Sequence, residues 1–127
     1  MKSVPRRVVL TGIGLISPLG NTKEALWDAL ISGRSGVGRF ESVPTQNLPM
    51  SFAAEARGFT GDVEEFGPLD KEQKKAIRKA LKVMCREIQM GVAAAQLAIT
   101  DGGLGPGKFL PEQFFAVRCE SNVHRGP

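Results

Sequence analysis

Histidine and cysteine are scarce in this sequence, which contains only His124, Cys85 and Cys119. Two cysteines provide no disulfide framework, and together with one histidine at these spacings they match no zinc-ligand pattern. Cys119 and His124 are the only conceivable thiol and imidazole pair, but a separation of five residues places them on opposite faces of a strand. We therefore predict no catalytic residue, no metal site and no cofactor in this chain.

Long apolar runs are also missing. No run approaches the ~20 residues needed to cross a bilayer, so we expect no membrane association. The basic start of the chain is followed by a short apolar run with glycines and no small-residue cleavage site, which does not predict a signal peptide. With 127 residues, 42% of them hydrophobic, the sequence predicts one small cytoplasmic domain.

The stretch 8–20 is apolar and punctuated by glycine. Its first residues, 8–10, predict a buried parallel strand that ends at Gly12 and Gly14. A dinucleotide-binding fingerprint would need a third glycine where Ser17 stands, and Pro18 delays the helix that should hold a pyrophosphate. We therefore interpret these glycines as a structural turn and not as a phosphate site.

A first helix is predicted from Thr22 to Ser32. Asn21 is the expected N-cap, and Glu24 stands at the capping-box position. Its apolar residues share one face, which we expect to pack against the sheet. The following stretch 34–48 has no periodicity and is interpreted as a surface connection.

A second, longer helical region is predicted from Asp70 to Thr100, with Asp70 as N-cap and Gln73 completing a capping box. A straight helix of this length would span about 45 Å, more than a small sheet covers. We therefore expect a break or bend at 84–86. Apolar residues at helical spacing predict the buried stripe Ile77, Leu81, Met84, Ile88, Val92, Ala95 and Ile99.

Three strands complete the expected α/β architecture, near Arg7 to Gly12, Phe52 to Ala56 and Phe114 to Val117. Helices connect them, so we expect at least partly parallel pairing. The loop 57–68 carries two phenylalanines that we expect to anchor it on the core, Phe59 and Phe66.

Three segments carry a family resemblance. Val8–Asn21, Leu26–Val37 and Ala93–Leu104 resemble the N-terminus, the first helix with its glycine-rich exit and the second helix of β-ketoacyl-acyl-carrier-protein synthases, the condensing enzymes of fatty-acid and polyketide synthesis. The resemblance covers about residues 6–117 and leaves 118–127 as an atypical tail. It implies an N-terminal partial β-ketoacyl synthase domain over 1–127. The fold would be an incomplete thiolase-like one: the βαβαβ start of the first half, with a mostly parallel sheet and a long second helix.

The chemistry of that family needs a cysteine that becomes acylated and two histidines. This chain has one histidine, and neither cysteine stands in the family's Ala-Cys elbow. Cys85 is expected inside the long helix, in or beside the core, where a structural role is favoured. The resemblance thus implies a synthase fragment that is inactive alone. The alternative is a small non-catalytic binding or structural protein that keeps the family's carrier-protein or dimer surface.

Positive charge is concentrated between Lys71 and Arg86, where seven cations are opposed only by Glu72. Such a run is often a solvated helix face. The family resemblance instead implies contact with acidic acyl carrier protein. A lone basic helix without interleaved aromatics argues against nucleic acid as the partner. Strands that lack neighbours also leave open sheet edges, so we expect a homo-oligomer. The candidate carrier-protein contacts are Lys74, Lys75, Arg78, Lys79 and Lys82.

Overall fold

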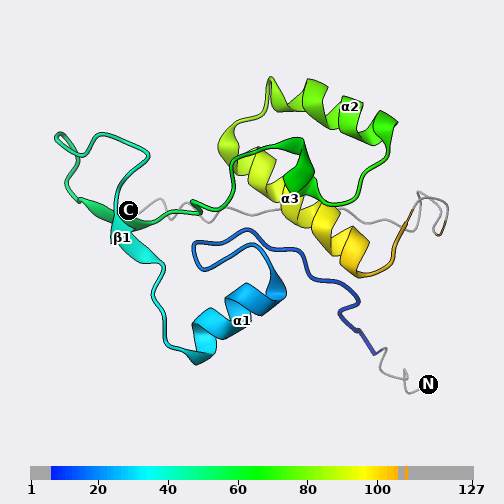
Figure 1. Cartoon of the computed structure of the whole chain (residues 1–127), viewed down its shortest axis with the longest axis horizontal. Coiled ribbons are helices and arrows are strands. Elements are labelled where there is room, and N and C mark those ends of the chain that lie inside the picture. Colours follow the sequence, from blue (N-terminus) through cyan, green and yellow to red (C-terminus); the bar gives the residue numbers. More distant parts are fainter. Residues whose placement is uncertain (1–6, 106–107, 109–127) are drawn as a thin grey trace, which may run out of the picture.

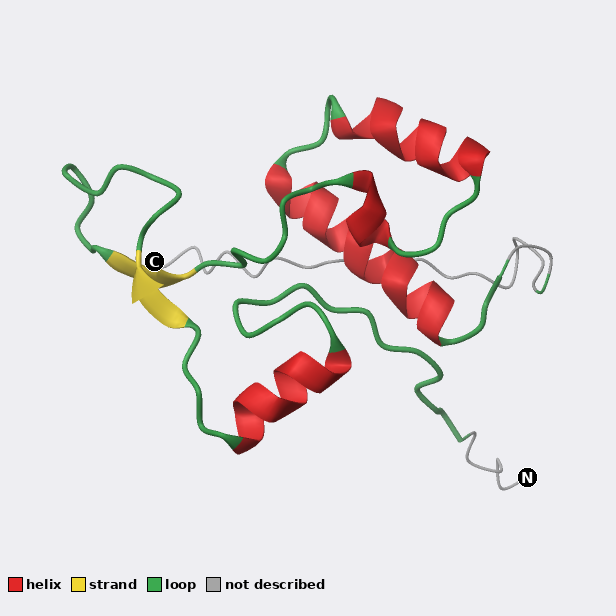
Figure 2. Ribbon diagram, in the orientation of Figure 1, coloured by secondary structure: helices red, strands yellow, loops and turns green. Residues whose placement is uncertain are grey.

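The computed structural model describes residues 7–105 and 108. In Figure 1, α2 and α3 lie one above the other, and the N-terminal segment passes between α1 and α3. The two strands lie apart from this group of helices (Figure 2). Within the described residues, no helix is both long and apolar enough to cross a membrane. In chain order the elements are α1 (Lys23–Ile31), β1 (Val37–Arg39), β2 (Phe52–Ala54), the 3-10 helix η1 (Val63–Phe66), α2 (Lys71–Leu81) and α3 (Arg86–Asp101).

The core lies between η1 and α3. Phe59 and Phe66 are buried, with ring centroids 6.1 Å apart, and pack with the buried Ala93 of α3. Their predicted role as anchors is confirmed. Partly buried apolar side chains surround this cluster: Ile16, Leu69, Ile77, Leu81, Met90 and Val92.

The long helical region is two helices with a break at the expected place. Helix α2 ends at Leu81, and α3 begins after Cys85, its N-cap residue. The predicted capping box of Asp70 and Gln73 is present at the start of α2. Beyond the break the predicted stripe is confirmed at Val92, which packs against the core, and is wrong at Ile88 and Ala95, which are exposed. The non-helical residues 82–85 change the helical phase between the two helices.

Helix α1 also differs from its prediction. Thr22, not Asn21, is the N-cap, and its hydroxyl accepts a hydrogen bond from the Ala25 N–H. Asn21 belongs to the preceding turn, where its side-chain oxygen accepts from the Ser17 N–H. Ala29 is buried, but Trp27 is 64% exposed, so the apolar face of α1 does not pack against a sheet among the described residues.

The sheet within the described residues is an antiparallel pair, and no parallel pairing is found among those residues. Val37 pairs with Ala54 and Arg39 with Phe52. The connection 40–51 contains no helix, so the chain returns directly and the strands run in opposite directions. Strand β2 lies where it was predicted, whereas β1 lies in the stretch interpreted as a surface connection. The predicted strand at Phe114 to Val117 lies outside the described residues.

The N-terminal segment is not a strand in the described structure. Residues 8–10 have no sheet partner there, and Val8 is 90% exposed. The glycines that follow pack closely on α3. A Cβ at Gly12 would lie 2.3 Å from the Ala98 carbonyl oxygen, and one at Gly14 would lie 2.0 Å from that of Ala94. These two positions need glycine because backbone meets backbone there.

Asp101, the last residue of α3, holds α1 and the N-terminal segment together. Its carboxylate accepts from the Lys23 ammonium on α1 and from the Ile13 N–H. The Lys23 hydrogen bond, followed by that from Ile13, holds the pKa of Asp101 below its ordinary value. The carboxylate thus joins three segments that are distant in the sequence.

The carboxylate of Glu55, beside the sheet, likewise joins separate segments through hydrogen bonds. It accepts hydrogen bonds from the Ser42 hydroxyl, from the backbone N–H groups of Glu41 and Ser42, and from Arg57. The Ser42 hydroxyl, and then the Glu41 N–H, lower the pKa of Glu55 to about 2. The ionised carboxylate therefore closes the long connection between β1 and β2.

Replacing Gly14 by Ala should destabilise the fold by ~1–3 kcal/mol, because the added methyl group overlaps the Ala94 carbonyl. Gly91, on the open side of α3, provides the matched control. There Gly91→Ala should stabilise by ~0.5–1 kcal/mol through helix propensity. Urea unfolding followed by circular dichroism compares both variants with the parent. Equal stability of the two variants would contradict the close packing described above.

Removing the Glu55 charge should give a stability loss that depends on pH. A depressed folded-state pKa contributes stability above the ordinary value of 4.5, and this contribution is lost as pH falls toward about 2. The melting temperature of Glu55→Gln should therefore lie below that of the parent at pH 6, and the difference should shrink between pH 4.5 and 2. A difference in melting temperature that stays constant between pH 6 and pH 2 would contradict this role of the Glu55 carboxylate.

Candidate functional site

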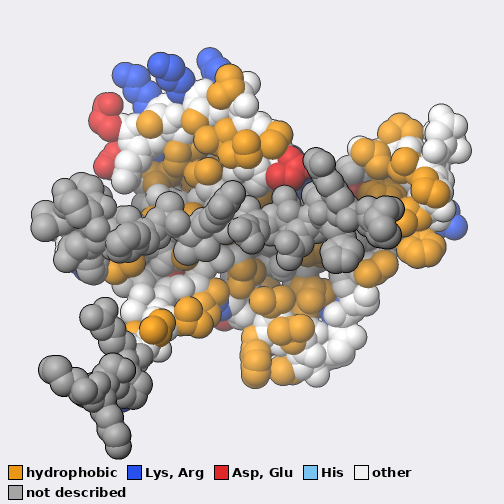
Figure 3. Space-filling model, turned by 180° about the vertical axis from the view of Figure 1, so that it is seen from behind, with side chains coloured by type: hydrophobic (Ala, Val, Ile, Leu, Met, Phe, Trp, Pro, Cys, Tyr) orange, Lys and Arg blue, Asp and Glu red, His pale blue; other side chains and the backbone are white. Residues whose placement is uncertain are grey.

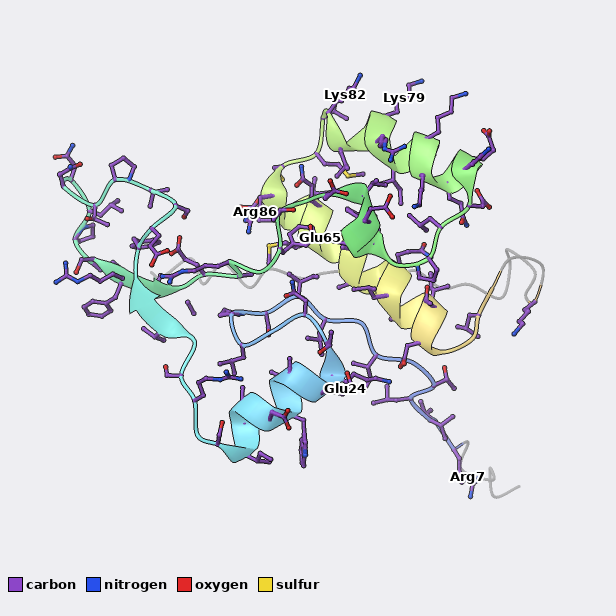
Figure 4. All side chains as sticks on the ribbon, in the orientation of Figure 1. Arg7, Glu24, Glu65, Lys79, Lys82 and Arg86 are labelled. Atoms are coloured by element: carbon purple, nitrogen blue, oxygen red, sulfur yellow. The ribbon has the colours of Figure 1, made fainter. Side chains whose placement is uncertain are left out.

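The basic segment predicted from sequence forms the outer face of α2. Lys75, Lys79 and Lys82 are exposed, and the labelled side chains of Lys79 and Lys82 point away from the rest of the molecule (Figure 4). Seen from behind, Lys and Arg side chains gather along one edge of the surface (Figure 3). The helix thus presents a row of cations to solvent.

This row extends further than predicted. Lys71, in the first turn of α2, is exposed too, and it stands four residues before Lys75, which stands four before Lys79. Side chains at this spacing lie along one side of a helix. The spacing is readable in the sequence, although the prediction omitted Lys71. We call Lys71, Lys75, Lys79 and Lys82 the outer row.

Lys74 and Arg78 face a different neighbour. The Lys74 ammonium lies 2.6 Å from one Glu64 carboxylate oxygen and 2.8 Å from the other. The Arg78 guanidinium lies 3.9 Å from the same carboxylate. The structure therefore divides the five predicted residues into three that face solvent and two that adjoin an acidic group from η1.

The acidic group is held in place by the fold of η1. Asp62 is the N-cap, and its carboxylate accepts the Glu64 N–H at 2.9 Å. The Glu65 carboxylate accepts N–H groups from 60–62. Burial raises the pKa of Glu65, but these N–H donors, with Thr60 and Gly61 foremost, prevail and lower it overall. Asp62 and Glu65 form a capping box, a signal that the sequence contains and that the loop prediction missed.

Arg86 is the last cation of the basic run, and its guanidinium is engaged within the fold. Its guanidinium donates to the carbonyl oxygens of Ala56 at 2.9 Å and Phe59 at 2.8 Å. It also lies 5.7 Å from the centroid of the Phe59 ring. Arg86 therefore fastens the loop before η1 to the start of α3 (Figure 4) and is engaged in the fold.

Cys85 does not lie where it was predicted. It is a free, exposed cysteine at the N-cap of α3, and not a residue within a helix or beside the core. A hydrogen bond from the Cys85 side chain is the main cause of the lowered pKa of the Glu87 carboxyl. Cys119 and His124 lie outside the described residues. Among residues 7–105 and 108, no group of metal-binding side chains is found.

A shallow hollow of about 610 Å³ lies between β2 and the start of α3. Its polar side chains are Glu41, Ser42, Glu55, Arg57 and Arg86. Each already makes an ion pair or hydrogen bond within the described residues, so the hollow offers no group that is committed to chemistry with a ligand. The outer row on α2 is therefore the better candidate for function.

Comparison with known proteins identifies one family. The model of the β-ketoacyl synthase N-terminal domain matches residues 5–119. Among curated proteins, a 3-oxoacyl-[acyl-carrier-protein] synthase 2 of Vibrio cholerae is 42% identical over 99 residues, which are 78% of this chain and 21% of that protein. A protein of the same name from Synechocystis is 36% identical over the same shares.

A more distant relative comes from a polyketide system. The tetracenomycin polyketide synthase ketoacyl synthase beta subunit of Streptomyces glaucescens is 29% identical over 84% of this chain and 23% of that protein. The chain thus spans about a fifth of the length of the curated relatives it matches.

Proposed function

Because this chain belongs to the β-ketoacyl synthase family, whose N-terminal domain it matches over residues 5–119, we propose that it is the N-terminal part of a β-ketoacyl-acyl-carrier-protein synthase. In this proposal 1–127 is a partial domain that provides scaffold and partner-docking surface. The condensation of acyl and malonyl thioesters depends on residues that this chain lacks. The solvent-facing row of cations on α2 is the observation that carries the docking role.

The partner of the outer row is an acidic acyl carrier protein. Exposed cations attract such a partner over roughly one Debye length, about 8 Å at physiological salt, and raise the rate of encounter. Lys75, Lys79 and Lys82 supply the charge, since none of them has an ion pair among the described residues. The names of the bacterial relatives include an acyl carrier protein, which supports this choice of partner.

Exposed apolar side chains support a larger assembly. Residues 8–10 have no strand partner among the described residues and are exposed, and Trp27 and Leu30 are exposed on α1. Apolar surface of this kind marks contact with other protein. We propose that further synthase polypeptide, or a second copy in a homo-oligomer, covers these residues.

Removing cations from the outer row should weaken binding to carrier protein. In the double variant Lys79→Ala with Lys82→Ala, the loss of two surface charge contacts should raise the Kd roughly 2- to 30-fold at low salt. Arg34→Ala with Arg39→Ala removes the same charge from exposed positions elsewhere and should change the Kd little. Titration calorimetry with a bacterial holo acyl carrier protein measures both. If both double variants lost the same affinity, net charge alone would explain the loss, and the outer row would have no specific role.

The chain alone should not form an acyl-enzyme. Covalent condensation needs an activated thiolate, and removing such a group abolishes most of the rate. Cys85 is exposed but has no histidine beside it among the described residues. Incubation with a long-chain acyl thioester, followed by intact-mass measurement, should show no stoichiometric adduct. An adduct on either cysteine that malonyl carrier protein then consumes would overturn the prediction.

A further inference from the structure

Glu64 of η1 places a negative charge beside two cations of α2, Lys74 and Arg78. Both of its carboxylate oxygens lie within hydrogen-bonding distance of the Lys74 ammonium, and one lies 3.9 Å from the Arg78 guanidinium. The Lys74 side chain is only 28% exposed, whereas that of Glu64 is 62% exposed. Lys74 is therefore the more enclosed member of the pair.

The carboxylate comes from a rigid position. Glu64 belongs to η1, which is fixed on one side by its capping box and on the other by the buried side chains of Val63 and Phe66. Helix α2 has no fully buried residue and contacts η1 along this side. Lys74 and Arg78 therefore face an acidic group whose backbone position is set by the core.

This arrangement changes what an acidic partner meets. Lys74, Arg78 and Glu64 together carry one positive charge where the two cations alone would carry two. A partner carboxylate that approached Lys74 would also meet the like charge of Glu64, and like charges in an interface are unfavourable. The outer row has no such competitor among the described residues.

We propose that Glu64 is a built-in competitor that withholds Lys74 from acidic partners and so favours docking on the outer row. For carrier protein this inference rests on the proposed function. The masking of Lys74 by Glu64 is a property of the chain itself and can be tested without any partner.

The first experiment measures the masking directly. The folded chain is treated briefly with an amine-acetylating reagent, and the rate at each lysine is read by peptide mass spectrometry. Because the Lys74 ammonium is hydrogen-bonded to both Glu64 carboxylate oxygens and its side chain is only 28% exposed, it should react about two- to fivefold more slowly than Lys75 and Lys79. In Glu64→Gln the rate at Lys74 should rise to theirs, whereas Glu72→Gln, which removes an acid of α2 itself, should leave it slow.

The second experiment measures the consequence for binding. Holo acyl carrier protein and a polyglutamate peptide are titrated at low salt into the parent chain, Glu64→Gln and Glu72→Gln. Glu64→Gln should bind both probes about two- to fivefold more tightly. The gain should exceed that of Glu72→Gln and should disappear when Lys74 is also changed to Gln. Thermal unfolding of each variant establishes that the fold is retained.

The outcomes separate the two proposals. If Lys74 is slow in the parent and released by Glu64→Gln, but carrier protein binds no variant, the masking stands and the proposed carrier-protein docking fails. If Lys74 reacts as fast as Lys75 in the parent, or Glu64→Gln leaves its rate unchanged, the masking is overturned. A binding gain that is equal in Glu64→Gln and Glu72→Gln would overturn the role of Glu64 as a competitor in docking, because net charge alone would then explain the gain.

Discussion

The packing of Phe59 and Phe66 against Ala93 is the contact on which the rest of the described structure depends. It joins η1 to α3, and Arg86 reinforces it by binding the carbonyl oxygens of the loop before η1. Because η1 is fixed in this way, Glu64 has a defined position beside α2. The distribution of charge on the functional surface therefore follows from two buried rings and a small residue that lets them approach the helix.

A second consequence concerns how the basic residues are used. In the sequence, the cations between Lys71 and Arg86 form one run, but in the structure they have three separate roles. Arg86 stabilises the core region, Lys74 and Arg78 adjoin Glu64, and the outer row faces solvent. Charge that is neutralised or hydrogen-bonded within the fold contributes little to attracting a partner. The proposed docking surface is therefore smaller, and more sharply defined, than the run of charges indicates.

The exposed apolar residues of the N-terminal segment and α1, unlike the hydrogen-bonded cations, are not covered within the described structure. Val8 and Leu10 lie in an extended segment without a strand partner, and Trp27 projects from α1. The close glycine contacts with α3 hold this segment in place even though it pairs with no strand among the described residues. A chain that spans about a fifth of the length of its relatives therefore keeps an ordered framework, with apolar surface that suits contact with further protein.

The sequence by itself determined the features that depend on local chemistry. These include the capping box at Asp70, the break near Cys85, the burial of Phe59 and Phe66, and the family, which is carried by contiguous motifs. Only the tertiary structure decided the rest. Whether an apolar run such as 8–10 becomes a strand depends on a partner strand, and the direction of pairing depends on how the chain returns. Likewise, no pattern within α2 reveals that Lys74 meets Glu64. That contact joins residues ten apart on two different elements, and the position of η1 is set by the buried core between η1 and α3.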